Sequence, residues 1–262
     1  LPFGPFSASF YNILLMKFLP ILRFPLTLLL SGSLCAQISF IKQTDLLTPV
    51  NHYSGVAIAV VDVNGDGLDD IVRLNAGKYL SISYQTAPNQ PFTVQFLDPV
   101  STVSQWGMCV ADIDNNGICD ILSGGRYDGV KFITANTDGS VFSTYTMTAP
   151  QTFVQGVNFF DVNNDGLLDA FVCHDDGVAR IFGNNGDGTF TFQLNWIDLT
   201  TFPMSDNSGN YGSVWSDGNN DGLTDLYIAK CRQGVTDPTD PRRINQLFLN
   251  NGDGTYTQDI DD

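Results

Sequence analysis

A nine-residue pattern that occurs four times constrains the fold of this chain more than any other feature of its sequence. The pattern reads Asp-x-[Asp/Asn]-x-[Asp/Asn]-Gly-apolar-x-Asp, and its copies begin at Asp62, Asp112, Asp161 and Asp217. These starts are 50, 49 and 56 residues apart. Regular spacing of this length is typical of proteins built from repeated supersecondary units. We therefore expect four repeats, starting near residues 55, 106, 155 and 211.

Each copy of the pattern is flanked by short runs with the composition of β-strands. In the first repeat, residues 56–61 precede the pattern and residues 71–73 follow it. Two more strand-like runs complete a repeat, joined in the later repeats by turns such as 184–188 and 250–254. Gly and Asn in these turns tolerate the positive φ angles that tight turns require. One repeat is therefore predicted to form four short antiparallel strands, which is the size of one β-propeller blade.

The composition supports an all-β fold. The chain has 28 acidic residues, and every one of them is Asp. Because Glu favours helices, its complete absence argues against a helical bundle. We predict an all-β protein made of β-propeller blades of four antiparallel strands, with about four blades present. Residues 38–43 resemble the fourth strand of a blade and are expected to form one.

The repeated pattern supplies ligands for a hard cation. Positions 1, 3 and 5 carry carboxylate or amide oxygens, position 7 offers a backbone carbonyl, and position 9 adds a closing carboxylate. Ca²⁺ in proteins takes about six to eight oxygen ligands, and Gly at position 6 permits a sharp turn. We expect about four Ca²⁺ sites, one in each repeat. The predicted ligands are Asp62, Asn64, Asp66, Leu68, Asp70, Asp112, Asp114, Asn116, Ile118, Asp120, Asp161, Asn163, Asp165, Leu167, Asp169, Asp217, Asn219, Asp221, Leu223 and Asp225.

Other calcium loops share the first six positions but do not fit the rest of the pattern. An EF-hand has Glu at position 12 between two helices, whereas position 12 is Arg73, Ser123, Val172 and Ile228 in the four copies. A dockerin-type loop fails for the same reason, and thrombospondin-type repeats follow one another much more closely. One alternative stays open, in which the four segments are Asp-rich turns without metal. Repulsion between clustered carboxylates favours the metal.

A family resemblance rests on these loops and on three longer segments. The segments are NNGDGTF at 184–190, NNGDGTY at 250–256 and YGSVWSDGNNDGLTDLYIAKC at 211–231. With the loops, they resemble FG-GAP/VCBS repeats over residues 38–262. The repeats are similar to the calcium-bearing blades of integrin α-subunit propellers, and the fourth is most similar to secreted bacterial proteins related to cartilage acidic protein.

This resemblance implies properties that the residues alone do not establish. It implies a seven-bladed calcium-binding propeller, an extracellular location, and roles in adhesion or in carbohydrate and protein binding. The chain has only four repeats, so we expect part of a seven-bladed propeller from a longer protein.

The first 36 residues have the features of a secretory signal peptide. Lys17 precedes an apolar run at 18–30, and small residues follow up to Ala36, which is the order of a charged region, an apolar region and a cleavage zone. A transmembrane helix is the alternative, but this run is shorter than the ~20 residues that a span needs. We predict upstream residues plus a signal peptide at 1–36 and a partial propeller at 37–262. The mature chain is expected to have no transmembrane span and to be secreted or at the cell surface.

The charge balance and one long connection indicate the kind of partner. A formal net charge of −16 argues against nucleic acid, whose phosphates need a basic surface. The expected ligand is an extracellular glycan or protein of unknown identity. Basic residues gather around the connection 231–244 of the fourth repeat, on the face away from the predicted metal loops. The candidate ligand-contacting residues are Lys230, Arg232, Arg242 and Arg243. The alternative is that pairing with Asp237 and Asp240 holds this connection in place.

The sequence favours a secreted calcium-binding module in which calcium is structural. No catalytic or cofactor-binding residue is assigned, and whether the chain is an enzyme stays open. A carbohydrate-active enzyme, a polysaccharide lyase or hydrolase on a calcium propeller, is the second hypothesis, and a purely structural scaffold is the third. His174 is either a general base or a surface turn residue. The cysteines outside the signal form one or two disulfides or remain free thiols: Cys109, Cys119, Cys173 and Cys231.

Overall fold

The computed structural model describes residues 40–47, 54–75, 77–147, 150–200 and 202–260. The predicted signal peptide lies outside the described residues. The chain divides into two compact units, Leu1–Lys42 and Gln43–Asp262, and the fold below is that of the second unit. Among the described residues, no helix has the length and apolar character needed to cross a membrane.

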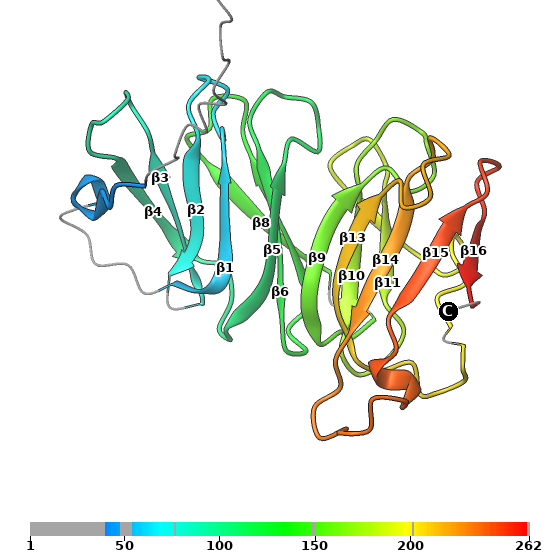
Figure 1. The fold of residues 1–262 in the computed structure, drawn as a ribbon. Coiled ribbons are helices and arrows are strands. Elements are labelled where there is room, and N and C mark those ends of the chain that lie inside the picture. Colours follow the sequence, from blue (N-terminus) through cyan, green and yellow to red (C-terminus); the bar gives the residue numbers. More distant parts are fainter. Residues whose placement is uncertain (1–39, 48–53, 76, 148–149, 201, 261–262) are drawn as a thin grey trace, which may run out of the picture. The chain divides into compact units, whose positions relative to one another are not determined.

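The described part of the second unit contains four sheets, each formed by four strands that are consecutive in sequence (Figure 1). The first blade contains β1 (Ser54–Val61), β2 (Asp70–Asn75), β3 (Tyr79–Tyr84) and β4 (Thr93–Pro99). The second contains β5 (Gln105–Ala111), β6 (Asp120–Gly125), β7 (Val130–Ala135) and β8 (Phe142–Met147). The third contains β9 (Val154–Phe160), β10 (Asp169–His174), β11 (Arg180–Asn184) and β12 (Phe190–Gln193). The fourth contains β13 (Asn210–Ser216), β14 (Asp225–Lys230), β15 (Gln246–Asn250) and β16 (Tyr256–Asp259).

Every pair of neighbouring strands is antiparallel. Two short 3₁₀-helices, η1 (Thr44–Leu47) and η2 (Pro241–Arg243), complete the regular structure of the described residues. The predicted all-β fold of four-stranded antiparallel blades is confirmed.

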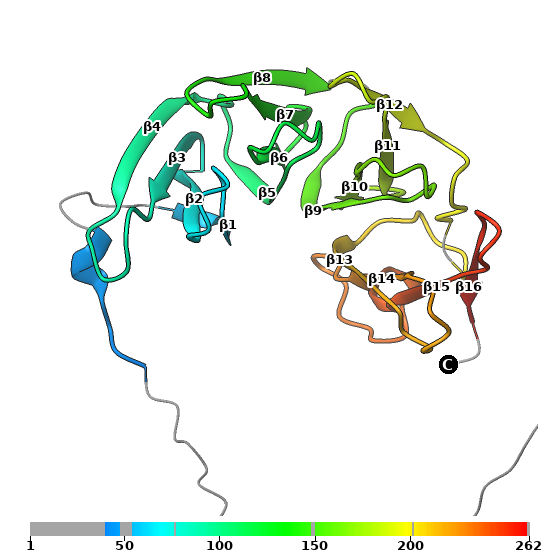
Figure 2. The same ribbon diagram turned by 90° about the horizontal axis from the view of Figure 1, so that it is seen from above.

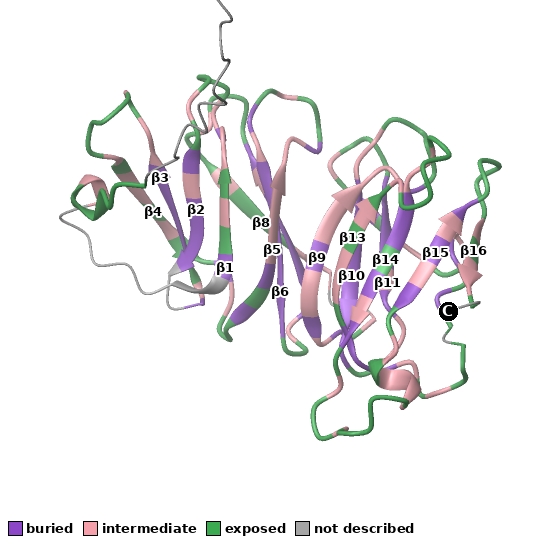
Figure 3. Cartoon of the chain, in the orientation of Figure 1, coloured by how far each residue is buried: buried purple, intermediate pink, exposed green. Residues whose placement is uncertain are grey.

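Successive blades meet through their first strands and through three apolar cores. β1 contacts β5, β5 contacts β9 and β9 contacts β13, and Figure 2 shows β4, β8 and β12 on the side away from these contacts. In chain order, the cores bring together Ile82 with Ile133, Phe132 with Phe182, and Phe171 with Phe248. Every residue of β6 and β10 is buried (Figure 3). Buried polar residues such as Asp120 and Ser123 lie in β6 beside the apolar Ile121 and Leu122.

The two ends of the blades carry different connections. In each blade, the loop between the first and second strands (the 1→2 loop) and the turn between the third and fourth strands (the 3→4 turn) lie at one end, which we call the loop face. The 1→2 loops are residues 62–69, 112–119, 161–168 and 217–224. The 2→3 connections lie at the other end, which we call the opposite face. In Figure 1 the longest of them, between β14 and β15, extends at the lower end of the blades. The loop face therefore gathers all four copies of the repeated pattern.

The first part of the chain differs from the sequence prediction. Residues 40–43 are not in a strand, although residues 38–43 were expected to form one. Phe40 and Ile41 are 95% and 80% exposed. A strand-like sequence becomes a strand only where a partner strand supplies ladder hydrogen bonds, and the segment itself does not encode that partner.

Candidate metal sites

The 1→2 loops share one hydrogen-bonded turn. In the second loop, the Asp112 carboxylate accepts from the backbone N–H groups of Asn116 (3.1 Å) and Gly117 (2.9 Å). Asp114 Oδ1 also accepts from the Asn116 N–H (3.1 Å), and Asn116 Oδ1 accepts from the Ile118 N–H (2.8 Å). The same four bonds recur in the other three loops. The side chains at positions 1, 3 and 5 are therefore folded back over the backbone of their own loop.

Two residues of each loop adopt a left-handed backbone conformation. The glycines at position 6 have φ between 84° and 89°, as the sharp turn was expected to need. Position 4 has positive φ as well, at Gly65 (73°), Asn115 (57°), Asn164 (58°) and Asn220 (61°). Only Gly and a few polar residues such as Asn adopt this conformation at low cost. The sequence carried this signal, because position 4 is Gly or Asn in every copy.

The carboxylates of the second loop are spaced closely enough to bind one calcium ion. Carboxylate oxygens of Asp112, Asp114 and Asp120 all lie within 4.8 Å of one another. Two oxygens that bind one Ca²⁺ at ~2.3–2.6 Å can be at most about 5 Å apart, so this spacing is compatible with one ion. A carboxylate oxygen that accepts one N–H bond keeps a second lone pair. Each loop offers the same four side chains at positions 1, 3, 5 and 9, namely three Asp and one Asn.

The Asp at position 9 also joins its loop to the rest of the blade. Asp169 Oδ2 accepts from the Val162 N–H (2.9 Å), and its Oδ1 accepts from the N–H of Asn184 at the end of β11 (2.9 Å). The same pair of bonds is made by the position-9 Asp of each other blade. All four of these carboxylates are buried. The sequence analysis assigned these residues to the metal and missed this second role. The register between strands decides which backbone N–H group of the third strand each carboxylate meets, and the sequence does not give that register.

Burial raises the pKa values of three position-9 carboxyls. Desolvation raises the pKa of Asp120 to about 6, and the nearby carboxylates of Asp114 and Asp112 act in the same direction. Desolvation likewise raises the pKa values of Asp70 and Asp169. A positive ion in the loop would favour the ionised form of these groups.

The side chain at position 7 packs against the 3→4 turn of the same blade. A Cβ on Gly252 would lie 3.1 Å from Leu223, and one on Gly186 would lie 3.3 Å from Leu167. Both glycines have φ of 75°. The glycines of the NGDG turns are therefore needed both for backbone conformation and for the space that the loop side chain occupies.

Loops of neighbouring blades are hydrogen-bonded to each other. The Cys119 N–H, at position 8 of the second loop, donates to the Val63 carbonyl of the first loop (2.8 Å). Asn184 Nδ2 of the third blade donates to the Ile113 carbonyl of the second loop (3.0 Å). Both acceptors are at position 2, next to the first predicted ligand. Asn184 Nδ2 also lies 3.2 Å from the Leu168 carbonyl of the third loop, so the first three loops form a connected row.

The candidate ligand residues on the opposite face mostly contact the protein itself. Lys230 is 6% exposed, and its Nζ has no hydrogen-bond partner among the described residues. Arg232 forms ion pairs with Asp175 (3.3 Å) and Asp176 (2.5 Å) of the third blade. The sequence analysis grouped these residues around one connection. In the structure Lys230 is buried, whereas Arg232 is paired with two carboxylates of the third blade.

The other two basic residues lie near η2. Arg242 forms ion pairs with Asp240 (2.7 Å) and Asp206 (3.8 Å). Arg243 donates to the Val235 carbonyl (2.7 Å). Asp237 accepts from the N–H and hydroxyl groups of Thr239. The Arg242–Asp240 pair is one of the contacts expected if this connection is held in place by its own ion pairs.

His174 differs from the expectation of a surface turn residue. It is 5% exposed at the end of β10, and its Nδ1 accepts from the Phe153 N–H (3.1 Å). Burial lowers the pKa of His174, and the charge of Arg180 acts in the same direction. Its surroundings therefore disfavour the charged form of the ring. The burial follows from the packing of the preceding link against β10, which no local pattern encodes.

The four described cysteines are free thiols. Cys109 and Cys173 lie on β5 and β10, Cys119 lies in the second loop, and Cys231 is exposed. Burial raises the pKa of Cys173 to about 12 and that of Cys119 to about 11. Of the two alternatives, the arrangement matches free thiols.

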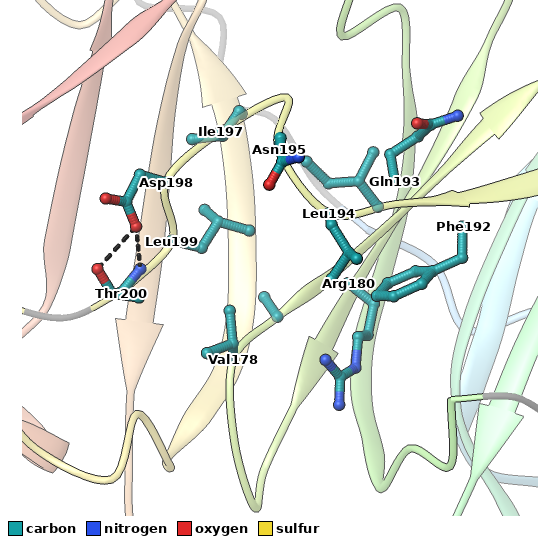
Figure 4. A pocket seen from close by; sticks show the side chains of 12 residues that line it. Val178, Arg180, Phe192, Gln193, Leu194, Asn195, Ile197, Asp198, Leu199 and Thr200 are labelled. Atoms are coloured by element: carbon teal, nitrogen blue, oxygen red, sulfur yellow. Dashed lines mark hydrogen bonds between the residues drawn. The ribbon is translucent and has the colours of Figure 1, made fainter.

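A pocket of about 510 Å³ lies beside β11, β12 and the link that follows them (Figure 4). Its lining includes one carboxylate, Asp198, which accepts from the N–H (3.1 Å) and the hydroxyl (2.7 Å) of Thr200. The guanidinium of Arg180 lies 5.6 Å from the centre of the Phe192 ring. The pocket thus combines apolar walls with one cation over an aromatic ring.

Comparisons with known proteins bear on the repeated loops. A family model described as an FG-GAP-like repeat matches residues 112–172 and 161–228, which include the second, third and fourth loops. Together with the propeller blades, this match identifies residues 112–228 as FG-GAP-like repeats, as the sequence predicted. No curated protein matches the chain.

Two solved structures show a distant likeness. One is a crystal structure of BBS1N in complex with ARL6DN, soaked with lead, with 14% identity, a TM-score of 0.46, and 82% of this chain and 56% of that chain covered. The other is the C-terminal domain of PilY1 from Pseudomonas aeruginosa, with 14% identity, a TM-score of 0.44, and coverage of 73% and 47%. This chain spans about half the length of the structures it matches.

Proposed function

We propose that this chain is a secreted β-propeller module that binds calcium through its four 1→2 loops and binds an extracellular glycan or protein in adhesion or recognition. The fold of FG-GAP-like blades suggests a binding module. The observation that carries the calcium proposal is the donor set, which is three Asp and one Asn at the same four positions of every loop. The hydrogen bonds that fold these side chains over the backbone support it, because they preorganise the oxygens.

Calcium in these loops would be structural. Its positive charge would offset the repulsion among three carboxylates held in one turn. The residues proposed to hold it are those at positions 1, 3, 5 and 9, together with the backbone carbonyl at position 7. The position-9 Asp would transmit this stabilisation to the third strand through its bond to the backbone.

Thermal unfolding with and without a chelator tests the calcium proposal. A ligand that binds only the folded state stabilises it by about 2.7 kcal/mol per site at a concentration ~100 times its Kd. We therefore expect the melting temperature to fall in EGTA and to recover with added CaCl₂. An unchanged melt, together with no calcium in elemental analysis of the purified protein, would contradict the proposal.

A matched pair of variants in the first loop separates ligation from net charge. Asp66 is at ligand position 5, whereas Asp69 is an exposed residue at position 8 of the same loop. Every loop keeps two carboxylates among positions 1, 3 and 5, and Asp66→Asn leaves only one. We expect Asp66→Asn to weaken calcium binding at this loop by about tenfold or more, and Asp69→Asn to leave it nearly unchanged. Equal effects of the two substitutions would show that only bulk charge matters.

Secretion and adhesion need separate readouts. N-terminal sequencing of protein recovered outside the producing cells is expected to find Gln37 as the first residue. Recovery of the protein only inside the cells, with residues 1–36 retained, would contradict secretion. Cell or matrix attachment to the immobilised module is expected in calcium and to be lost in EGTA.

A further inference from the structure

An aromatic cluster on the opposite face is centred on Phe153. The ring of Trp106, from β5, lies 5.1 Å from the Phe153 ring in an edge-on arrangement. The ring of Tyr127, from the β6–β7 turn, lies 5.8 Å from it. Trp106 is 38% exposed and Tyr127 is 41% exposed. The cluster therefore presents two large, partly exposed rings fixed on a common support.

Tyr127 is held in an unfavourable backbone conformation. Its φ is 56°, which is rare for a bulky side chain. Its N–H donates to the Thr152 carbonyl (3.0 Å), and its hydroxyl donates to the Asp176 carboxylate. Strain of this kind persists where the surroundings enforce it and is concentrated at binding sites. A Gly at this position would form the turn without strain, so the ring itself requires an explanation.

Two guanidinium groups and two carboxylates lie near the aromatic cluster. The guanidinium of Arg126 lies 5.5 Å from the centre of the Phe153 ring, and Arg126 is exposed. Among the described residues, Arg126 has no ion pair with a carboxylate. Arg232 contacts both Asp175 and Asp176, and Asp176 in turn accepts from Tyr127. Two guanidinium groups and two carboxylates therefore cancel in formal charge beside the exposed rings.

We propose that Trp106, Tyr127 and Arg126 form a binding site for a neutral pyranose oligosaccharide. This inference rests on the proposed binding function and names its ligand class. A pyranose presents a face of C–H groups that packs on the electron-rich face of an aromatic ring. Its hydroxyls both donate and accept, which suits a site with guanidinium donors and a carboxylate acceptor. The local charge balance suits a neutral ligand, and the net charge of −16 opposes an acidic polymer.

Calorimetric titration and Trp fluorescence with defined saccharides test the proposal. The probes are cellotriose, mannotriose and galactotriose, with trigalacturonate as the acidic comparison and a tyrosine-containing acidic hexapeptide as the protein comparison. We expect at least one neutral trisaccharide to bind with a Kd of about 1 mM or tighter. No binding by any of the three neutral sugars overturns the proposal, as does tighter binding of trigalacturonate or of the peptide.

Two substitutions locate the binding surface, and a third serves as the control. Trp106→Ala removes one ring. Tyr127→Gly removes the other at a position where Gly relieves strain, so this variant is expected to fold even if the first does not. Each is expected to weaken sugar binding about tenfold. Tyr79→Ala, at a Tyr that is 47% exposed on the first blade, is expected to leave binding unchanged.

The chelator melt distinguishes failure of this inference from failure of the calcium proposal. A protein that gains stability with calcium but binds no neutral sugar overturns the saccharide site alone. Retained sugar binding in the folded Tyr127→Gly and Trp106→Ala variants places the sugar elsewhere and overturns it as well. Sugar binding that depends on Trp106 in a protein that binds no calcium supports the site and overturns the metal.

Discussion

The position-9 Asp of each repeat is the residue on which loop and blade both depend. Asp169 is fully buried, and each of its oxygens accepts one backbone N–H, from Val162 and from Asn184. These bonds lower its pKa, but desolvation is the larger effect and raises it. An Ala side chain here would leave two buried N–H groups without acceptors. The residue is therefore required by the fold independently of any ion.

Replacement of Asp169 by Ala is expected to destabilise the protein even in chelator. Leaving a buried backbone donor unpaired costs about 1–3 kcal/mol, so for the two donors we expect a loss of about 2–6 kcal/mol in urea unfolding. Asp187→Ala is the control, because Asp187 is an exposed residue of a 3→4 turn and its loss should cost about 1 kcal/mol or less. A destabilisation of Asp169→Ala that is seen only with calcium would show that the residue acts through the ion alone.

Lys230 is a buried cation whose charge opposes folding. Burial lowers its pKa from 10.5 to about 8, although the Asp206 carboxylate acts in the other direction. Below pH 8 the ammonium is charged in both the folded and unfolded states, so its full desolvation cost is present. Between about pH 8 and 10.5 the unfolded chain binds more protons than the folded one, and stability rises with pH.

Lys230→Met is therefore expected to be more stable than the wild type at pH 7, by up to about 2 kcal/mol. The difference should shrink as the pH rises from 8 towards 10. Urea denaturation at pH 7 and pH 10, at fixed ionic strength and fixed free calcium, measures it. A difference that is constant across this range would mean that packing of the longer side chain, and not its charge, decides the result.

At the scale of elements, each 1→2 loop and the 3→4 turn beside it form one packed unit. Leu223 of the fourth loop fills the space above Gly252 in the turn between β15 and β16. Gly254 in the same turn also has a left-handed φ, of 86°, but a Cβ there would have no neighbour within 4 Å. The two glycines therefore separate backbone strain from loss of packing space.

Gly252→Ala is expected to destabilise the protein more than Gly254→Ala. Both substitutions place Ala at positive φ, at a cost of about 1–2 kcal/mol, but only the first also displaces Leu223. Thermal unfolding of the two variants measures the difference. Adding Leu223→Ala to Gly252→Ala should remove the extra cost through non-additivity. Equal losses in the two single variants would contradict this packing role.

At the scale of the whole molecule, the loop face is a row of hydrogen-bonded loops. The second loop is bonded to the first through Cys119 and Val63, and to the third blade through Ile113 and Asn184. Each acceptor carbonyl is adjacent to a proposed ligand, so a disturbed loop displaces the backbone of its neighbour. We therefore expect the proposed calcium sites of the first three loops to be coupled.

Loss of the second site is expected to weaken its neighbours. We expect Asp112→Ala to remove one calcium from the stoichiometry and to weaken binding at the first loop about threefold to tenfold. Asp217→Ala, in the fourth loop, whose hydrogen bonds among the described residues stay within its own blade, should remove one calcium with less effect on the others. Calcium titration calorimetry of both variants compares them. Independent sites, with identical residual affinities in the two variants, would contradict the coupling.

Local features of the fold were predictable from the sequence. The four copies of the pattern predicted four four-stranded antiparallel blades, because hairpin turns and strand alternation are encoded within a few residues. The turn at positions 4 and 6 could also be read from Gly and Asn at Gly65 and Gly67. Residues 40–43 show the limit of such reasoning, because a strand-like segment needs a sheet edge that the segment itself does not encode.

Features that depend on neighbouring blades were not predictable. The burial of His174 and Lys230 follows from packing of links and blades far apart in the sequence. The ion pairs of Arg232 with Asp175 and Asp176 cross from one blade to the next, whereas sequence inspection considered only acidic residues on its own connection.

The sequence by itself determined the repeat, the antiparallel blades and the set of oxygen donors in each loop, because all of these depend on contacts within about 50 residues of the chain. Only the tertiary structure decided which charges are buried or paired, which loops touch, and how Trp106, Tyr127 and Phe153 meet on the opposite face. The physical reason is that the blades assemble through apolar cores. Those cores fix how far apart side chains from different blades lie, and no pattern within one repeat encodes these distances.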